Sequence, residues 1–217
     1  MFTGIVAAVG RIEKTSPFGD GLRLEITPGT LDVGDIGVGD SVAVSGCCLT
    51  VVEKRTGAAS TRLMFDVSAE TLRCTVGLDG PGDVNLEKAL RLADRLGGHL
   101  MTGHVDGVGT VVAFDEVEMG SGPISGPDSA PEPASRSWRL EIEAPAPLAR
   151  FIAAKGSIAV QGVSLTVNGD EGDRFHVNLI PHTLEVTTLK DLRAGSLVNL
   201  EIDLVARYVE RLSSSVL

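Results

Sequence analysis

The sequence predicts an all-β protein built from two tandem homologous six-stranded Greek-key barrels with a C-terminal helix. The first indication is an internal repeat, because residues 40–51 recur as residues 156–167 with more than half of the positions identical. Other short segments, such as residues 1–6 and 100–105, recur in the same order at a spacing of about 100 residues, longer than the units of solenoid proteins. Short β-rich runs bounded by glycine, aspartate or proline fill both copies and are typical of barrels and sandwiches.

Six β-rich runs define the strands that we expect in the first copy, and the second copy repeats the series. Turns rich in glycine separate them, as antiparallel strands with short connections require. The expected strands span residues 11–14, 22–27, 41–44, 49–53, 64–67 and 83–87.

A helix is expected between the two copies. Residues 87–96 place leucines and alanines on one helical stripe, and Gly97 and Gly98 supply a left-handed stop. In the second copy, residues 115–136 form an insertion rich in glycine, proline, serine and acidic residues. Such a composition predicts a mobile hairpin extension.

A second helix is expected near the C-terminus, over residues 204–212. Its apolar face either packs on its own barrel or contacts another subunit. The predicted domains are residues 1–97, a first ligand-binding barrel; residues 98–203, a second one; and residues 204–217, a C-terminal helix that is a candidate subunit contact. The apolar face of this helix consists of Val205, Tyr208, Val209 and Leu212.

Composition narrows the ligands and the compartment. The formal charge of −10 at pH 7 disfavours nucleic acid and anionic membranes, so a small molecule of little charge is expected. No secretory signal or membrane span is expected, which indicates a cytosolic protein. Cys47, Cys48 and Cys74 form neither an even disulfide set nor a C-x-x-C motif, which indicates reduced thiols. We expect neither a metal nor a nucleotide cofactor, because their sequence motifs are missing.

The two copies differ at their reactive side chains, which predicts two related pockets with unequal roles. His104 replaces an aliphatic residue of the first copy and is a candidate proton carrier, or alternatively a structural histidine. Cys48 aligns with Ser164, polar with polar, and is expected as a thiol near a barrel mouth, although cysteine is often a small buried apolar residue. His99, next to the glycine pair, is expected as a cap or turn residue.

Three further residues have either a structural or a functional role. Thr71 and Thr183 follow strand-like runs and either cap a short turn or meet a ligand. Lys155 precedes the recurrent segment and has no basic counterpart at Gly39, and lone lysines are usually only exposed surface residues.

Several motifs of the chain belong together. They are the opening residues 1–6, Gly-Cys-Cys-Leu-Thr-Val at 46–51, Gly-Gly-His-Leu-Met with Gly-His-Val at 97–105, Gly-x-Ser-Leu-Thr-Val at 162–167 and Leu-Ile-Pro-x-Thr-Leu at 179–184. In this ordered set, which spans essentially the whole chain, the sequence resembles riboflavin synthase of the alpha-chain type.

The resemblance implies an enzyme that converts two molecules of 6,7-dimethyl-8-ribityllumazine into riboflavin and 5-amino-6-ribitylamino-pyrimidinedione by transfer of a four-carbon unit. It implies no cofactor, one lumazine in each barrel, and a homotrimer whose active sites lie between the first domain of one subunit and the second domain of a neighbour. It leaves open whether a lumazine synthase capsid encloses the trimer. The alternative is a non-catalytic lumazine- or flavin-binding protein on the same duplicated barrel.

By position, the resemblance also assigns site residues. His104 would carry the proton, Cys48 would lie near the ring carbon that is attacked, and Ser41 would be a supporting polar group. The ligand contacts of the first domain would be Gly4, Ile5, Val6, Cys48, Leu49, Thr50, Asp66, Val67, Ser68, Ala69, Glu70 and Thr71. Those of the second would be Gly103, His104, Val105, Lys155, Ser164, Leu165, Thr166, Asn178, Leu179, Ile180, Pro181, His182 and Thr183.

Overall fold

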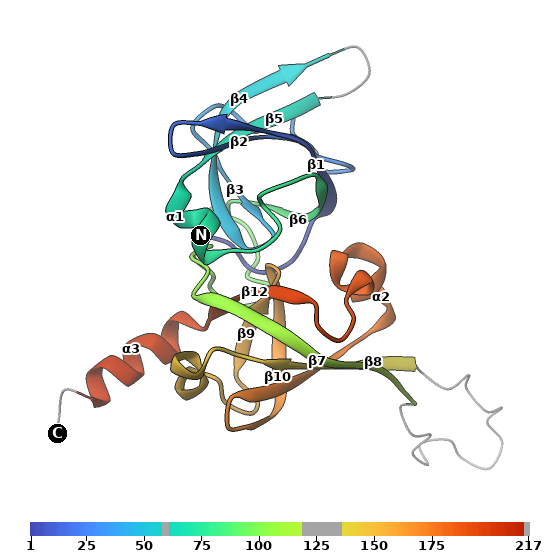
Figure 1. The fold of residues 1–217 in the computed structure, drawn as a ribbon, viewed down its shortest axis with the longest axis vertical. Helices are drawn as coiled ribbons and strands as arrows, with labels where there is room; N and C mark the ends of the chain where they lie inside the picture. The colour runs from blue at the N-terminus through green and yellow to red at the C-terminus, as the bar shows by residue number, and fades with distance from the viewer. Residues whose placement is uncertain (58–60, 119–135, 215–217) are drawn as a thin grey trace.

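The computed structural model describes residues 1–57, 61–118 and 136–214, and it confirms the all-β prediction. The chain forms two closed six-stranded antiparallel barrels, which lie one above the other in Figure 1. Around the first barrel the strand order is β1-β2-β5-β4-β3-β6, and the second barrel has the same order with each number raised by six. Because β2 pairs with β5 rather than β3, each barrel is a Greek key.

The six expected runs all form strands, mostly longer than the runs themselves. The first barrel contains β1 Ala8–Phe18, β2 Gly21–Thr27, β3 Ser41–Val44, β4 Cys47–Thr56, β5 Thr61–Val67, helix α1 Ala69–Cys74 and β6 Gly82–Lys88. The second contains β7 Gly107–Glu118, β8 Arg136–Glu143, 3₁₀ turn η1 Ala146–Phe151, β9 Ser157–Val160, β10 Val163–Glu171, β11 Arg174–Leu179, helix α2 Pro181–Val186, 3₁₀ turn η2 Thr188–Asp191 and β12 Leu197–Ile202.

Each barrel is filled by the inward side chains of its own strands. Val42 and Leu49 face each other across β3 and β4, and both are buried in the first core. Val160 and Val163 do the same in the second core. Since side chains alternate along a strand, the residues between these positions point outward. Most of the functional candidates lie on these outward faces. Leu49, Val67, Leu165 and Leu179 do not, because alternation turns their side chains toward the cores, so their prediction as side-chain ligand contacts is wrong.

The helix predicted at residues 87–96 is wrong. Glu87 and Lys88 end strand β6, where they pair with β3, and the described residues after them form a loop with one turn. The backbone N–H of Leu90 donates to the carbonyl of Met1 at 2.8 Å. Helical propensity amounts to tenths of a kcal/mol per residue, so pairing with a neighbouring strand overrides it here.

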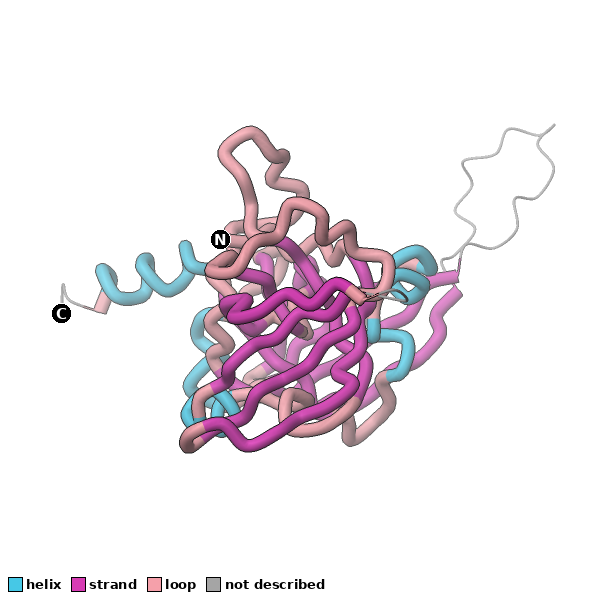
Figure 2. The backbone as a smooth tube through the Cα atoms, turned by 90° about the horizontal axis from the view of Figure 1, so that it is seen from above, coloured by secondary structure: helices cyan, strands magenta, loops and turns pink. Residues whose placement is uncertain are grey.

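The predicted C-terminal helix is confirmed as α3, Leu204–Ser213, with Asp203 as its N-cap. It extends away from both barrels in two perpendicular views (Figures 1 and 2). Its apolar residues are exposed, with Tyr208 at 61% and Leu212 at 69%. Nothing in the described part of this chain covers that face. No helix among the described residues is long and apolar enough to cross a membrane.

The predicted insertion lies mostly outside the described residues. Strand β7 runs into its first residues and β8 begins at its last one, Arg136. The three cysteines are unpaired thiols, of which Cys47 is buried.

Two equivalent asparagines hold the barrels together. Asn199, on β12, accepts from the N–H of Val76 through Oδ1 at 2.8 Å and donates through Nδ2 to the carbonyl of Ser45 at 3.1 Å. Asn85, on β6, donates to the carbonyl of Gln161 at 2.9 Å. Both asparagines are 2% exposed. Each therefore satisfies buried backbone groups of the other barrel.

Replacing Asn199 with alanine should lower the free energy of unfolding by about 2–4 kcal/mol, because it leaves buried backbone groups without partners. Denaturant unfolding measures this loss. Alanine at the exposed Asn178 is the control and should change stability by less than about 0.5 kcal/mol. Equal losses in the two variants would contradict the role of Asn199.

Candidate functional site

The first candidate site lies on the outer face of the first barrel, where it meets the second. Cys48 pairs with Ala43 and Thr50 with Ser41, so these four side chains share the outward face of β3 and β4. Cys48 is half-buried and packs against the small cluster around Phe2 that joins the barrels. Cys48 is the second residue of β4, close to the strand entrance as predicted, and its side chain lies on the outer face of the barrel and not in the interior. The inward positions of these strands belong to the core.

The outward stripe continues onto β5. Val51 pairs with Phe65 inside the core, which turns the flanking Thr50 and Asp66 outward. Asp66 is held by two hydrogen bonds from Arg23, one from Nε at 2.6 Å and one from a terminal nitrogen at 2.8 Å. Ser68 follows as the N-cap of α1, accepting from the N–H of Thr71.

The second copy repeats this arrangement with other side chains. Ser164 pairs with Ala159 and Thr166 with Ser157, and both pairs face outward. The stripe continues through the exposed Asn178 to α2. Proline at the first position of α2 suits a helix start, since its missing N–H would have no helical partner there. Of the other predicted residues, Ile180, Pro181 and His182 are exposed and Thr183 is half-buried at the start of α2, whereas Leu165 and Leu179 pack on the second core.

Two segments cross between the barrels, and we call residues 3–6 and 102–105 the crossing segments. The carbonyl of Gly4 accepts from the N–H of Ser164 at 2.9 Å, and the carbonyl of Gly103 accepts from the N–H of Cys48 at 2.8 Å. Val6 packs against the second core and Val105 against the first.

The crossing segments contact the opposite sites from those to which the sequence analysis assigned them. Gly4, Ile5 and Val6 lie against the second site, although the family resemblance had assigned them to the first. Gly103, His104 and Val105 lie against the first site, beside Cys48. The sequence repeat reveals that both segments exist, but it does not reveal which barrel each one reaches.

Both crossing glycines are sterically required. Gly4 and Gly103 have φ values of +77° and +78°, which side chains with a Cβ rarely adopt. A Cβ on Gly103 would lie 2.6 Å from the Cβ of Cys48, and one on Gly4 would lie 2.5 Å from the Cβ of Ser164. The close approach of backbone to strand therefore depends on glycine.

A buried carboxylate holds each crossing segment. Glu87 accepts from the N–H and hydroxyl of Thr3, both at 2.7 Å, and Glu201 accepts from the same groups of Thr102 at 2.7 and 2.8 Å. Burial raises the pKa of both carboxyls, although these hydrogen bonds oppose the rise.

His99 is a site residue that the sequence prediction missed. It was expected as a cap or turn residue, but it is 8% exposed and its Nδ1 lies 2.7 Å from the hydroxyl oxygen of Ser164. Its Nε2 is buried without a partner among the described residues. Burial lowers the pKa of His99, which favours the neutral ring.

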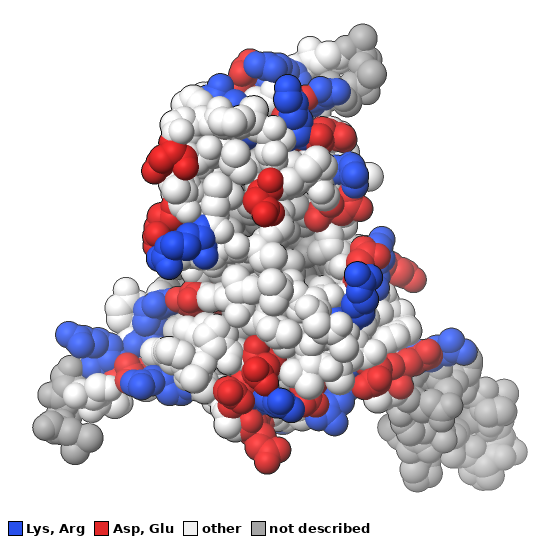
Figure 3. Space-filling view, in the orientation of Figure 1, with Lys and Arg blue, Asp and Glu red and all other residues white. Residues whose placement is uncertain are grey.

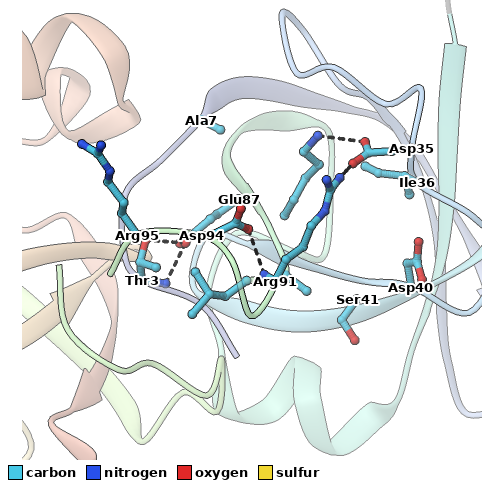
Figure 4. A pocket seen from close by; sticks show the side chains of 13 residues that line it. Thr3, Ala7, Asp35, Ile36, Asp40, Ser41, Glu87, Arg91, Asp94 and Arg95 are labelled. Carbon is cyan, nitrogen blue, oxygen red and sulfur yellow. Dashed lines mark hydrogen bonds and ion pairs between the residues drawn. The ribbon is translucent and has the colours of Figure 1, made fainter. Parts of the chain in front are cut away.

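Ser41 also lines a pocket beside the first barrel, with a volume of about 560 Å³. Figure 4 shows it with Asp40 on one wall and Glu87 and Thr3 deeper inside. Lys88 and Arg91 both pair with Asp35 at its rim. Its charged groups largely neutralise one another. On the face in Figure 3, acidic and basic side chains form small mixed groups, and the waist between the barrels is mostly uncharged.

Lys155 adopts a left-handed backbone, with φ of +68°, at the turn where the first copy has Gly39. A non-glycine residue there costs of order 1–3 kcal/mol. Its side chain is exposed, and its backbone N–H donates to the carbonyl of Val167 at 2.7 Å. A strained lysine in place of glycine is typical of a functional position.

Replacing Lys155 with glycine should therefore weaken ligand binding at the second site without weakening the fold. Relief of strain and the greater freedom of the unfolded chain oppose each other, so the free energy of unfolding should stay equal or rise by up to about 2 kcal/mol. Thermal unfolding and ligand titration measure the two effects. Lys190→Gly, at an exposed lysine outside the site, serves as a control for ligand binding. Unchanged binding in Lys155→Gly would refute a ligand contact.

Two homologous barrels, each completing the outward site of the other, define a duplicated small-molecule-binding protein. The lumazine binding domain family matches residues 3–89 and 102–203. Riboflavin synthase of Mycobacterium tuberculosis is 44% identical over 221 residues, covering 99% of each chain, and that of Brucella abortus is 41% identical over 217 residues, covering 98% of each. The chain therefore belongs to the riboflavin synthase family of duplicated lumazine-binding proteins.

Solved structures agree with this assignment. LumP complexed with riboflavin superposes with a TM-score of 0.74 at 29% identity, covering 93% of this chain and 99% of LumP. LumP complexed with 6,7-dimethyl-8-(1'-D-ribityl) lumazine gives a TM-score of 0.73 at 27% identity, with the same coverage.

Proposed function

We propose that this protein is a riboflavin synthase, which converts two molecules of 6,7-dimethyl-8-ribityllumazine into one riboflavin and one 5-amino-6-ribitylamino-pyrimidinedione. Full-length similarity to several riboflavin synthases supports this activity. The structural observation that carries it is a pair of homologous outward sites with unequal side chains. Such a pair suits a reaction that joins two identical molecules in unequal roles.

The proposed chemistry needs positioning more than added reagents. One lumazine loses a methyl proton and attacks the ring of the other, and the four-carbon transfer then leaves one product larger and the other smaller. Atoms and electrons balance between the two substrates, so the reaction requires no external oxidant. Holding both rings in register removes much of the entropic barrier.

The proposed residue roles are those that the family resemblance implies. His104 moves the proton at the lumazine methyl group, Cys48 lies near the attacked carbon, and Ser41 supports them as a polar group. In the second site, the Ser164 hydroxyl is oriented by His99. Backbone groups next to Thr50 and Ile180 would read the pyrimidine edge, and threonine hydroxyls would meet the ribityl chain.

We further propose that the protein acts as a homotrimer, with one lumazine in each of the domains 1–97 and 98–203 and with α3 at the subunit contact. The exposed apolar face of α3 supports an assembly in which a second copy covers it. We assign the protein to the cytosol, because its cysteines are unpaired thiols. Sedimentation of the full chain beside a variant carrying Tyr208→Asp and Leu212→Asp tests the contact.

The activity is tested by incubating the purified protein with 6,7-dimethyl-8-ribityllumazine alone and following absorbance and chromatography. Loss of two lumazines for each riboflavin formed supports the proposal. A lumazine that binds but is not converted would instead indicate a ligand carrier, the alternative reading of the same fold.

A further inference from the structure

We propose that the two buried glutamates are positioning residues that act across the barrel boundary: Glu201 of the second barrel positions the first site, and Glu87 of the first barrel positions the second. This inference rests on the proposed function for its effect on turnover. Its structural part stands on the contacts alone.

Glu201 connects the second barrel to Cys48 through the crossing segment. It lies on β12 and is 4% exposed. One carboxylate oxygen accepts from the N–H and hydroxyl of Thr102, and the other accepts from the N–H of Gly103 at 3.0 Å. The carbonyl of that same Gly103 accepts from the N–H of Cys48 at 2.8 Å. Glu201 is thus two hydrogen bonds away from the thiol-bearing residue of the other barrel.

The same carboxylate fixes the residue that carries the imidazole. The Thr102 hydroxyl, which donates to Glu201, accepts from the N–H of His104 at 3.3 Å. His104 itself is exposed, so its side chain is accessible to a ligand. Its backbone is fixed by the hydrogen bond to the Thr102 hydroxyl.

Glu87 makes the mirror-image connection. It lies on β6, is 7% exposed, and accepts from Thr3 and from the N–H of Gly4 at 2.9 Å. Gly4 then accepts from the N–H of Ser164 in the second barrel at 2.9 Å. The N–H of Ile5, which corresponds to His104, donates to the Thr3 hydroxyl at 3.2 Å. Figure 4 shows Glu87 beside Thr3.

A carboxylate suits this role because it has two acceptor oxygens for three donors. Neither glutamate forms an ion pair with a described lysine or arginine, so its burial is costly, and the raised pKa values agree with that. An amide in its place offers one acceptor oxygen and points an NH₂ group at a backbone N–H. Glutamine therefore keeps the volume and loses at least one bond.

Alkylation of Cys48 by iodoacetamide tests the direction of the coupling in ligand-free protein. Cys74→Ser removes the other accessible thiol, and Cys47 is buried with its pKa raised to about 12. In this background, Glu201→Gln should speed alkylation of Cys48 about fivefold, the factor expected from one lost hydrogen bond. Glu87→Gln, the matched control, should leave that rate within about twofold.

Riboflavin as a probe ligand supplies the second readout. It should protect Cys48 less well in Glu201→Gln and equally well in Glu87→Gln, whereas both variants should lower kcat for lumazine. Equal acceleration of alkylation in both variants, or in neither, would overturn the inference. If Glu201→Gln fails to fold, Thr102→Ala against Thr3→Ala tests the same connection. A wild-type protein that does not convert lumazine would refute the proposed function, while the alkylation rates would still decide the coupling.

Discussion

Replacing His104 with alanine should lower kcat for riboflavin formation by about 10²- to 10⁴-fold, the usual cost of removing a proton-transfer group. The imidazole is exposed on a crossing segment whose backbone is fixed by Thr102 and whose neighbour Gly103 bonds to Cys48. Nothing in these contacts uses the side chain for folding. Single-turnover kinetics with 6,7-dimethyl-8-ribityllumazine measure the loss, and the melting temperature should stay within about 2 °C of wild type.

His176→Ala is the control for this prediction. His176 lies half-buried on β11, beside a separate hollow on the wall of the second barrel. Its removal should leave kcat within about twofold, as expected for a residue that shares no partner with the site. Full turnover by His104→Ala would remove His104 from the proposed chemistry and leave ligand positioning by the crossing segments as the main contribution.

A Gly103→Ala substitution should lower the free energy of unfolding by about 2–4 kcal/mol and abolish most activity. Part of the loss comes from a positive φ that alanine disfavours, and part from a methyl group placed on the Cβ and backbone nitrogen of Cys48. Relief of this clash requires the crossing segment to move away from the first site. Chemical denaturation and turnover together measure the two consequences.

Gly172→Ala separates the two causes. Gly172 has φ of +66°, but a Cβ there meets nothing within 4 Å. It should therefore show only the backbone cost of about 1 kcal/mol and full activity. If Gly103→Ala is no more harmful than Gly172→Ala, close packing at Cys48 is not what glycine provides.

The two copies share one scaffold and differ in the side chains of their candidate sites. The scaffold is the same in each, down to an outward strand pair, a glutamate and a crossing glycine. The differences are at the candidate site positions: Cys48 and His104 belong to the first site, and Ser164, His99 and Ile5 belong to the second. One backbone design therefore presents two chemical surfaces to one kind of molecule.

The limits of local sequence patterns are clearest at the junction of the two barrels. Residues 87–96 have a helical apolar stripe, yet strand pairing with β3 and the Met1 carbonyl holds the start of this segment extended. His99 looked like a turn residue because it follows two glycines, while its burial depends on the distant Ser164. Both errors arise because long-range contacts outweigh local preferences of a few tenths of a kcal/mol.

The sequence alone determined the duplicated barrels, their strands, the C-terminal helix and the types of residue at each site. Period-two alternation is a local property that burying one face of a strand requires, and the repeat is visible by comparing the two halves of the sequence. Only the tertiary structure decided which barrel each crossing segment contacts, and that Glu87 and Glu201 hold segments bonded to the opposite barrel. Those facts depend on hydrogen bonds between residues far apart in the chain, whose pairing no local pattern encodes.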